Sequence, residues 1–190
     1  MPIVRAGERF RTSQPGIESW HVLSAGAHYD PARVRLGPFV GIDEHVLAPG
    51  AGFASHAHRG VTIVSWVVSG TLAHRPAAGD PTLVGPGEVL VQHTGSGIRH
   101  AEANASPDEP LRLVQTTLLS DGDAAPATVV GTAPVDVGEG LLLGREPTAP
   151  AYVYVLSGSW RDLAPGDFAY VAEPPEGAGE LLVWCVRSKA

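Results

Sequence analysis

The stretch "GFASHAHRGVTIVSWVVSG", from Gly52 to Gly70, decides the fold of this chain. Its second half is rich in β-branched residues and ends at a glycine, which is typical of a buried β-strand. Its first half places His56 and His58 two positions apart, so that in an extended strand both imidazoles project to one face. Burying an imidazole is costly unless its nitrogens find partners. The pair therefore predicts contact with solvent, with hydrogen-bonding neighbours or with a metal ion.

The rest of the chain repeats the strand signals of this stretch. It has 190 residues, of which 44% are hydrophobic, and its 23 glycines and 17 prolines follow no fixed period. Short β-branched runs, from "RVRLGPFVGIDEHVLAP" at residues 33–49 to "LRLVQTTLLS" at residues 111–120, are separated by Gly, Pro or Asp. No stretch of comparable length has helical periodicity. We expect an all-β protein built as a sandwich or barrel.

Composition excludes several classes of function. A formal net charge of −7 argues against a nucleic-acid surface, although it leaves a protein partner open. No run reaches the roughly 18 apolar residues of a membrane span, and the first ten residues lack the apolar region of a secretion signal. A single cysteine, Cys185, rules out an intramolecular disulfide and fits a reducing compartment. We expect a soluble, cytoplasmic protein with Cys185 as a core thiol.

A short pattern occurs twice. "VVSG" at Val67–Gly70 precedes "GPGE" at Gly85–Glu88, and "VLSG" at Val155–Gly158 precedes "APGD" at Ala164–Asp167. A strand that ends in glycine, a loop, and then Pro-Gly-acid therefore recur in the same order, which indicates an internal duplication.

The two copies predict three parts in the chain. We expect an N-terminal metal-binding unit over residues 1–120, a Gly- and Pro-rich linker over 121–139, and a shortened second unit over 140–190. All eight histidines precede Asn104, so the second unit is expected to hold no metal ligands.

A second close pair complements the histidines of the opening stretch. In "GSGIRHAEA", His100 and Glu102 share the same two-residue spacing, so they too would lie on one face of a strand. If the two strands were neighbours, three imidazoles and one carboxylate would converge. Fe, Mn, Ni, Cu and Zn accept such ligands, and an octahedral ion would keep two positions for a substrate or O₂. Either pair alone could equally be a solvated strand end.

These motifs resemble those of a known family. "AGFASHAHRGVTIVSWVVSGTLAH" followed by "GPGEVLVQHTGSGIRHAEAN" is similar to the pirin family of the cupin superfamily, with the match running over about residues 36–119. The resemblance implies a bicupin, here with a reduced C-terminal unit. It also implies one metal ion in the N-terminal unit, most often Fe(II), on residues matching His56, His58, His100 and Glu102. Mn, Ni, Cu, Co and Zn are the other candidate ions.

The chain departs from the family pattern at Thr62. Pirins usually have a glutamate there, in "H-R-G-F-E"; because that glutamate is not a metal ligand, coordination should survive while an orienting role is altered. Four other residues near the motifs are expected to have no direct part in the chemistry of the site. Arg59 is expected to form an ion pair at the rim, with binding of an anionic substrate as the alternative. His45, His74 and His93 are expected to be structural, with a place in the lining of the pocket as the alternative.

The resemblance to bacterial pirins implies a quercetin 2,3-dioxygenase-like oxidoreductase that uses O₂ and a flavonol-like substrate. Glu102 would be both a ligand and the base that accepts the flavonol proton. The resemblance to eukaryotic pirins implies the alternative, an iron-dependent redox-sensing protein that binds a protein partner without turnover. A purely structural ion is the third reading.

Overall fold

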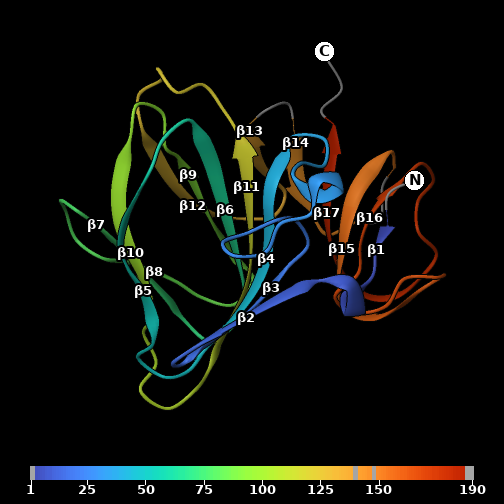
Figure 1. Ribbon diagram of the computed structural model, residues 1–190, viewed down its shortest axis with the longest axis horizontal. Helices are drawn as coiled ribbons and strands as arrows, with labels where there is room; N and C mark the ends of the chain where they lie inside the picture. The colour runs from blue at the N-terminus through green and yellow to red at the C-terminus, as the bar shows by residue number, and fades with distance from the viewer. Residues whose placement is uncertain (1–2, 139–140, 147–148, 187–190) are drawn as a thin grey trace. The chain divides into compact units, whose positions relative to one another are not determined.

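The computed structural model describes residues 3–138, 141–146 and 149–186 (Figure 1). The all-β expectation is confirmed, because the only helical segments in this part of the chain are two short 3-10 turns, η1 (Ala6–Glu8) and η2 (Pro31–Arg33). Neither approaches the length and hydropathy that a membrane-crossing helix requires. The described residues divide into two compact units, one over 10–132 and the other over 3–9 together with the described part of 133–186.

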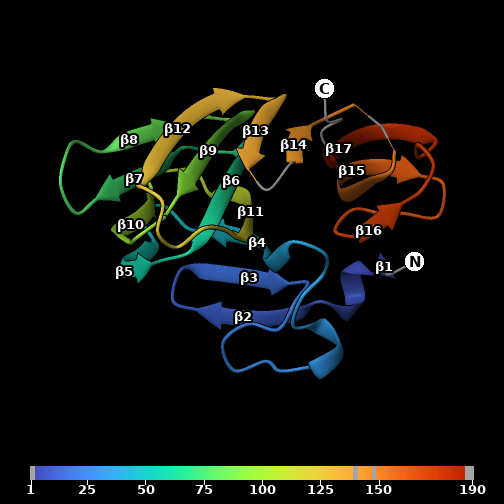
Figure 2. The same cartoon turned by 90° about the horizontal axis from the view of Figure 1, so that it is seen from above.

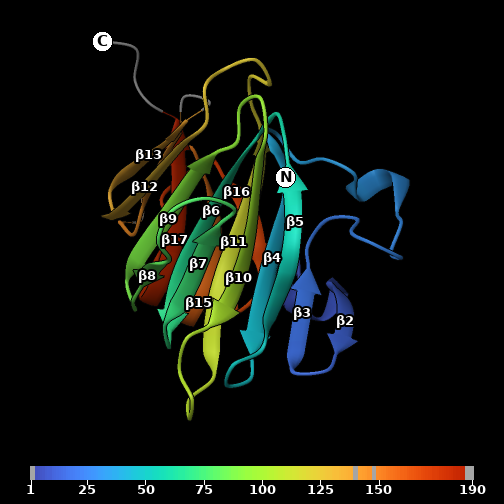
Figure 3. The same cartoon turned by 90° about the vertical axis from the view of Figure 1, so that its left-hand side faces the viewer.

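The first unit consists of two antiparallel sheets with the jelly-roll arrangement (Figure 3). The larger sheet has the spatial order β12-β9-β6-β11-β4-β3-β2, with the β2–β3 hairpin at one edge and β12 at the other (Figure 2). Its strands are β2 (Phe10–Gln14), β3 (Ile17–His21), β4 (Phe39–Leu47), β6 (Val61–Ser69), β9 (Glu88–His93), β11 (Leu111–Leu119) and β12 (Ala127–Thr132). The smaller sheet has the order β5-β10-β7-β8, from β5 (Gly52–His58), β10 (Ile98–Asn104), β7 (Leu72–Pro76) and β8 (Thr82–Val84).

Apolar side chains from both sheets form the core of this unit. Leu72 of β7 and Val84 of β8 pack with Leu47, Leu90 and Leu113 of the larger sheet, and all five are essentially inaccessible to solvent. Each such side chain contributes about 1.5–3 kcal/mol through the area it removes from water. This packing holds the smaller sheet, which carries the motif histidines, against the larger one.

The centre of the larger sheet explains the opening stretch of sequence. In β6, six consecutive residues from Thr62 to Val67 are buried, so both faces of the strand are covered. A strand covered on both faces has a continuous apolar run rather than a strict alternation of apolar and polar residues. The β-branched run "VTIVSWVV" therefore encodes a central strand.

The second unit is one six-stranded sheet with the order β1-β16-β15-β17-β14-β13. Its strands are β1 (Ile3–Val4), β13 (Val135–Gly138), β14 (Leu141–Gly144), β15 (Ala151–Trp160), β16 (Phe168–Val171) and β17 (Gly177–Val186). Val153 and Val155 of β15 pack with Leu181 and Val183 of β17 in its core. Cys185 is half-buried beside this cluster; it forms no disulfide, and its thiol donates to the carbonyl oxygen of Leu142 at 3.6 Å.

The boundaries of the two units differ from the expected ranges in two ways. Residues 127–132, expected in a linker, form β12 and pair with β9, so they complete the edge of the first unit. Residues 3–4 form β1 and pair with β16, so the start of the described chain belongs to the second unit. Both are short edge strands whose partners lie far away in sequence, and local composition does not reveal such pairings.

Hydrogen bonds bear out the repeated pattern. In the first unit the Gly87 N–H donates to the carbonyl of Val67 at 2.8 Å, and in the second the Gly166 N–H donates to the carbonyl of Val155 at 2.9 Å. Both glycines have a positive φ, 78° and 87°, which a side chain would disfavour. The two Pro-Gly turns therefore close onto equivalent strands in the same way.

The acidic residue of each turn also has an equivalent role. Glu88 accepts a hydrogen bond from the backbone N–H of Gly85 at 2.6 Å, and Asp167 accepts one from that of Ala164 at 3.1 Å. Asp167 goes further, because its carboxylate also accepts from the Ala6 N–H at 2.7 Å and from the Arg5 guanidinium at 2.8 Å. One buried carboxylate thus fastens the N-terminal segment to the second unit.

We predict that Asp167→Asn lowers the free energy of unfolding by about 1–3 kcal/mol at pH 7, the usual cost of breaking a buried charge-assisted network. Burial acts to raise the pKa of Asp167, but the bonds from Ala164, Arg5 and Ala6 outweigh burial and hold that pKa below its usual range. A lowered folded-state pKa gives stability that is present above the unfolded-state pKa and is lost as pH falls through the folded-state pKa. The difference between wild type and variant should therefore shrink from about pH 4 downward.

Urea denaturation at a series of pH values measures this difference. The exposed Asp108→Asn change is the control and should leave the free energy of unfolding nearly unchanged. A wild-type advantage over Asp167→Asn that stays constant down to pH 2 would contradict the role of the ionised carboxylate.

Candidate metal centre

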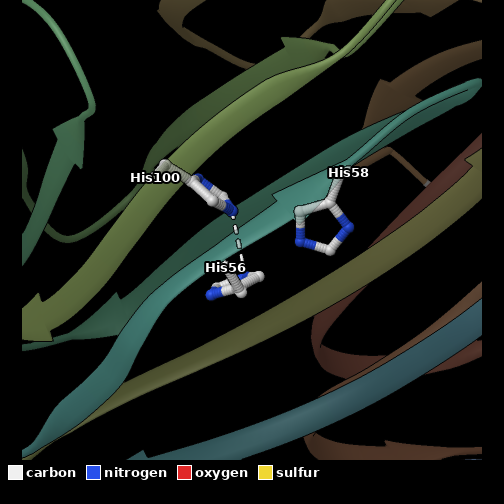
Figure 4. Close-up of side chains that lie close together, drawn as sticks. All are labelled: His56, His58 and His100. Carbon is white, nitrogen blue, oxygen red and sulfur yellow. Dashed lines mark hydrogen bonds between the residues drawn. The ribbon is translucent and has the colours of Figure 1, made fainter.

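Two paired strands of the smaller sheet bring the motif histidines together. β5 carries His56 and His58, β10 carries His100, and the antiparallel register sets His100 directly opposite His56. Because residues two apart in a strand share a face, His58 projects to the same side as His56. Figure 4 shows the three imidazoles gathered on that side.

The three rings are close enough to share one ligand. His56 Nε2 lies 3.1 Å from His100 Nε2, and the ring centroids are separated by 4.6 Å (His56–His100), 4.7 Å (His56–His58) and 5.1 Å (His58–His100). One nitrogen from each ring lies within 4.8 Å of the others, and within the described residues these three form the sole cluster of this kind.

The backbone fixes the tautomer of His56. Its Nδ1 lies 2.7 Å from the carbonyl oxygen of Ala54. A carbonyl only accepts hydrogen bonds, so Nδ1 carries the proton and Nε2 presents a lone pair toward His100. Metal-binding imidazoles are commonly oriented in this way, with the second ring nitrogen donating to a carbonyl.

Burial favours the neutral form of His100 and His58. His100 is 1% exposed, and burial, followed by the nearby His56, His58 and His74, lowers its pKa to about 3. Burial and His56 also lower the pKa of His58. Neutral imidazoles offer lone pairs, which a metal ion requires.

The geometry fits a metal ion. Bonds of about 2.0–2.1 Å from one ion to two adjacent imidazoles place their nitrogens about 3 Å apart, which matches the 3.1 Å between His56 Nε2 and His100 Nε2. Without an ion, at least one of these nitrogens must carry a proton. The residues present therefore suit a site of three imidazoles with further positions for other ligands.

Glu102 lies deeper than the histidines. It is 3% exposed, and its carboxylate accepts hydrogen bonds from Gln115 Nε2 at 3.1 Å and, at the limit of hydrogen-bond length, from Gln92 Nε2 at 3.5 Å. The register of β10 against β5 shifts between His100 and Glu102. The carboxylate is not part of the three-histidine cluster, although the two-residue spacing suggested that it would be. Burial raises the pKa of Glu102, and the hydrogen bond from Gln115 partly opposes this.

Sequence reasoning missed the two glutamines. Gln92 lies in β9 and Gln115 in β11, and Gln115 also donates to Ser65 Oγ at 2.8 Å. The available signal was a lone amide inside an apolar strand, as in "EVLVQH", because a polar side chain in a core strand must have a partner there.

The other residues considered from sequence take varied positions. Arg59 forms the expected rim ion pair, with Asp123 at 3.3 Å, and both side chains are exposed. His45 is buried and bonds Ser19 Oγ through Nδ1 at 2.8 Å, which fits a structural histidine.

Thr62 also takes a defined place at the position of the family's usual glutamate. It is 1% exposed, and its hydroxyl lies 3.0 Å from His93 Nδ1, on the strand paired with its own. The position therefore keeps a polar contact but no charge.

We predict that His56→Ala weakens zinc binding by more than about 100-fold, because losing an outer contact of a metal ligand alone costs about 10–100-fold. Competition with a chromophoric chelator measures the dissociation constant. His28→Ala serves as the control, since His28 stacks on Phe10 and bonds the Arg11 carbonyl away from the cluster. Equal zinc affinity in His56→Ala and wild type would show that the cluster is not the binding site.

Known proteins are similar to this chain in sequence and in fold. The chain is 35% identical over 126 residues to a putative quercetin 2,3-dioxygenase of Mycobacterium tuberculosis, which covers 66% of this chain and 52% of that protein. It is 32% identical over 117 residues to the quercetin 2,3-dioxygenase of Escherichia coli K12, covering 62% and 51%. The chain thus spans about half the length of the curated relatives it matches.

Comparison with solved structures extends the likeness to the whole fold. The bacterial pirin YhhW of Escherichia coli, solved in complex with nickel(II), superposes with a TM-score of 0.83 over 98% of both chains at 22% sequence identity. The model of the family described as Pirin matches residues 4–118, which include all three clustered histidines. With the family motifs and the jelly-roll fold both present, this chain belongs to the pirin family.

Proposed function

We propose that this protein binds one metal ion and acts as a quercetin 2,3-dioxygenase-like oxidoreductase on a flavonol-like substrate and O₂. The observation that carries the proposal is the convergence of three imidazoles, with His56 Nε2 and His100 Nε2 at the spacing of two ligands on one ion. Relatives named as quercetin 2,3-dioxygenases, and a pirin solved with nickel(II), support it.

We assign His56, His58 and His100 as metal ligands, with Fe(II) as the first choice of ion and Mn, Ni, Cu, Co or Zn as the others. Three imidazoles leave open positions on an octahedral ion. A metal ion held there would supply a Lewis-acid and redox centre that brings the substrate and O₂ together.

We assign Glu102 two roles, fourth ligand and proton acceptor. The carboxylate lies two residues from His100 on the same strand and is shielded from bulk water. Gln115 holds Oε2 at 3.1 Å, while Gln92 reaches Oε1 only at 3.5 Å. Oε1 is thus the more loosely held oxygen, and we place there the proton taken from the flavonol hydroxyl.

We predict that protein loaded anaerobically with Fe(II) consumes O₂ and releases carbon monoxide from quercetin, and that His100→Ala abolishes both. An oxygen electrode together with a haem-based carbon monoxide assay measures the two gases. Absence of turnover in protein shown to be fully loaded would reject the dioxygenase and favour an iron-dependent redox-sensing protein with a protein partner. If removing the metal lowered thermal stability but no substrate turned over, the ion would be structural.

We predict that Glu102→Gln lowers kcat by about 10²–10⁴-fold, the usual contribution of a general base. Metal content should stay close to that of the wild type, because the three imidazoles remain. Steady-state kinetics with quercetin and metal analysis of the same preparation measure the two quantities, and the exposed Glu109→Gln is the matched control. Full activity in Glu102→Gln would remove the role of Glu102 as base.

A further inference from the structure

Four buried polar atoms beside the histidine cluster are unaccounted for. Among the described residues, both ring nitrogens of His74, the Nδ1 of His100 and the Oε1 of Gln92 have no hydrogen-bond partner. His74 is 3% exposed and Gln92 is fully buried. An unpaired buried polar atom costs about 1–3 kcal/mol, so four in one place call for an explanation.

These atoms belong to neighbouring side chains. The ring of His74 meets that of His100 edge to face, with centroids 5.2 Å apart. His74 lies on β7 opposite Glu102 of β10, and Gln92 reaches the same Glu102 through its Nε2. His74 therefore contacts the imidazole of His100 and lies opposite Glu102, the residue that the amide of Gln92 contacts.

The direction of hydrogen bonding is fixed at both ends. Gln92 Nε2 donates to Glu102 Oε1, which leaves the amide oxygen of Gln92 as an acceptor. At the other end, a His100 that gives the lone pair of Nε2 to a metal ion must carry its proton on Nδ1, which makes Nδ1 a donor.

With His100 protonated at Nδ1, the four atoms comprise two hydrogen-bond donors and two acceptors, so each can have a partner. A neutral His74 has one N–H and one lone pair. It can accept one hydrogen bond, from His100 Nδ1–H, and donate one, to Gln92 Oε1, while Gln92 Nε2 donates to Glu102 Oε1. If His100 instead carried its proton on Nε2, the same group would contain three acceptors and a single donor, and two acceptors would stay unpaired.

Resting on the proposed metal centre, we propose that His74 is a positioning residue for His100. A series of hydrogen bonds runs from His100 through His74 and Gln92 to Glu102, and it holds His100 in the Nδ1–H tautomer. The imidazoles of His100 and His74 bond each other either directly or through one bridging water. These hydrogen bonds connect the imidazole of His100, a proposed metal ligand, to the carboxylate of Glu102, the proposed base. His74 itself contacts neither the ion nor the substrate.

Zinc binding to a matched set of variants tests this role. His74→Leu keeps an apolar side chain of similar size but can neither donate nor accept, and it should weaken zinc binding by about 10–100-fold. His74→Gln can do both and should recover most of the loss. His45→Leu, which removes an equally buried histidine bonded to Ser19, should leave the dissociation constant unchanged.

A spectroscopic measurement separates positioning from a loss of stability. In zinc-loaded, ¹⁵N-labelled wild type, two-bond ¹H–¹⁵N spectra should show His100 protonated at Nδ1, with that proton protected from exchange. Faster exchange in His74→Leu, together with weaker zinc binding, supports the proposal. If His100 of the wild type is protonated at Nε2, the proposed role of His74 is overturned. This measurement uses the wild type alone, so it does not depend on whether His74→Leu folds.

His100→Ala distinguishes the two levels of the argument. Equal zinc affinity in wild type and His100→Ala would reject the metal centre, and the role of His74 with it. Loss of zinc binding in His100→Ala, with wild-type affinity and exchange in His74→Leu, would retain the centre and reject His74 as its positioning residue.

Discussion

The pairing of β10 with β5 is the constraint on which the candidate centre depends. Antiparallel register sets His100 across from His56, and the pleat carries His58 to the same face. A slip of one residue would turn His100 to the opposite face and dissolve the cluster. Phe53 of β5 packs against the apolar core of this unit, and this contact resists such a slip because it would be lost with it.

Much of this arrangement could be read from the sequence, because it follows local rules. Spacing of two residues predicted that His56 and His58 share a face, and the continuous apolar run predicted the buried strand β6. The recurrence of Pro-Gly-acid predicted two equivalent turns, and the hydrogen bonds of Gly87 and Gly166 match. In each case a few neighbouring residues determine the geometry.

Features that depend on distant partners could not be read in this way. The depth of Glu102 results from the register shift in β10 and from amides supplied by β9 and β11, which a two-residue spacing cannot encode. His74 looked like an ordinary structural histidine because its importance arises only from the unpaired atoms around it. The edge strands β1 and β12 likewise owe their place to long-range pairing.

The pairing of β1 with β16 also limits the conformational freedom of the first unit when that unit unfolds. The first unit is inserted between the two segments of the second, so a folded second unit joins the two ends of residues 10–132. When the first unit unfolds alone, its chain is a tethered loop with fewer conformations than a free chain. By analogy with a crosslink that closes a loop of this length, the tether stabilises the first unit by up to about 4–5 kcal/mol. The short strand β1 thus contributes to the stability of the first unit, although β1 itself belongs to the second unit.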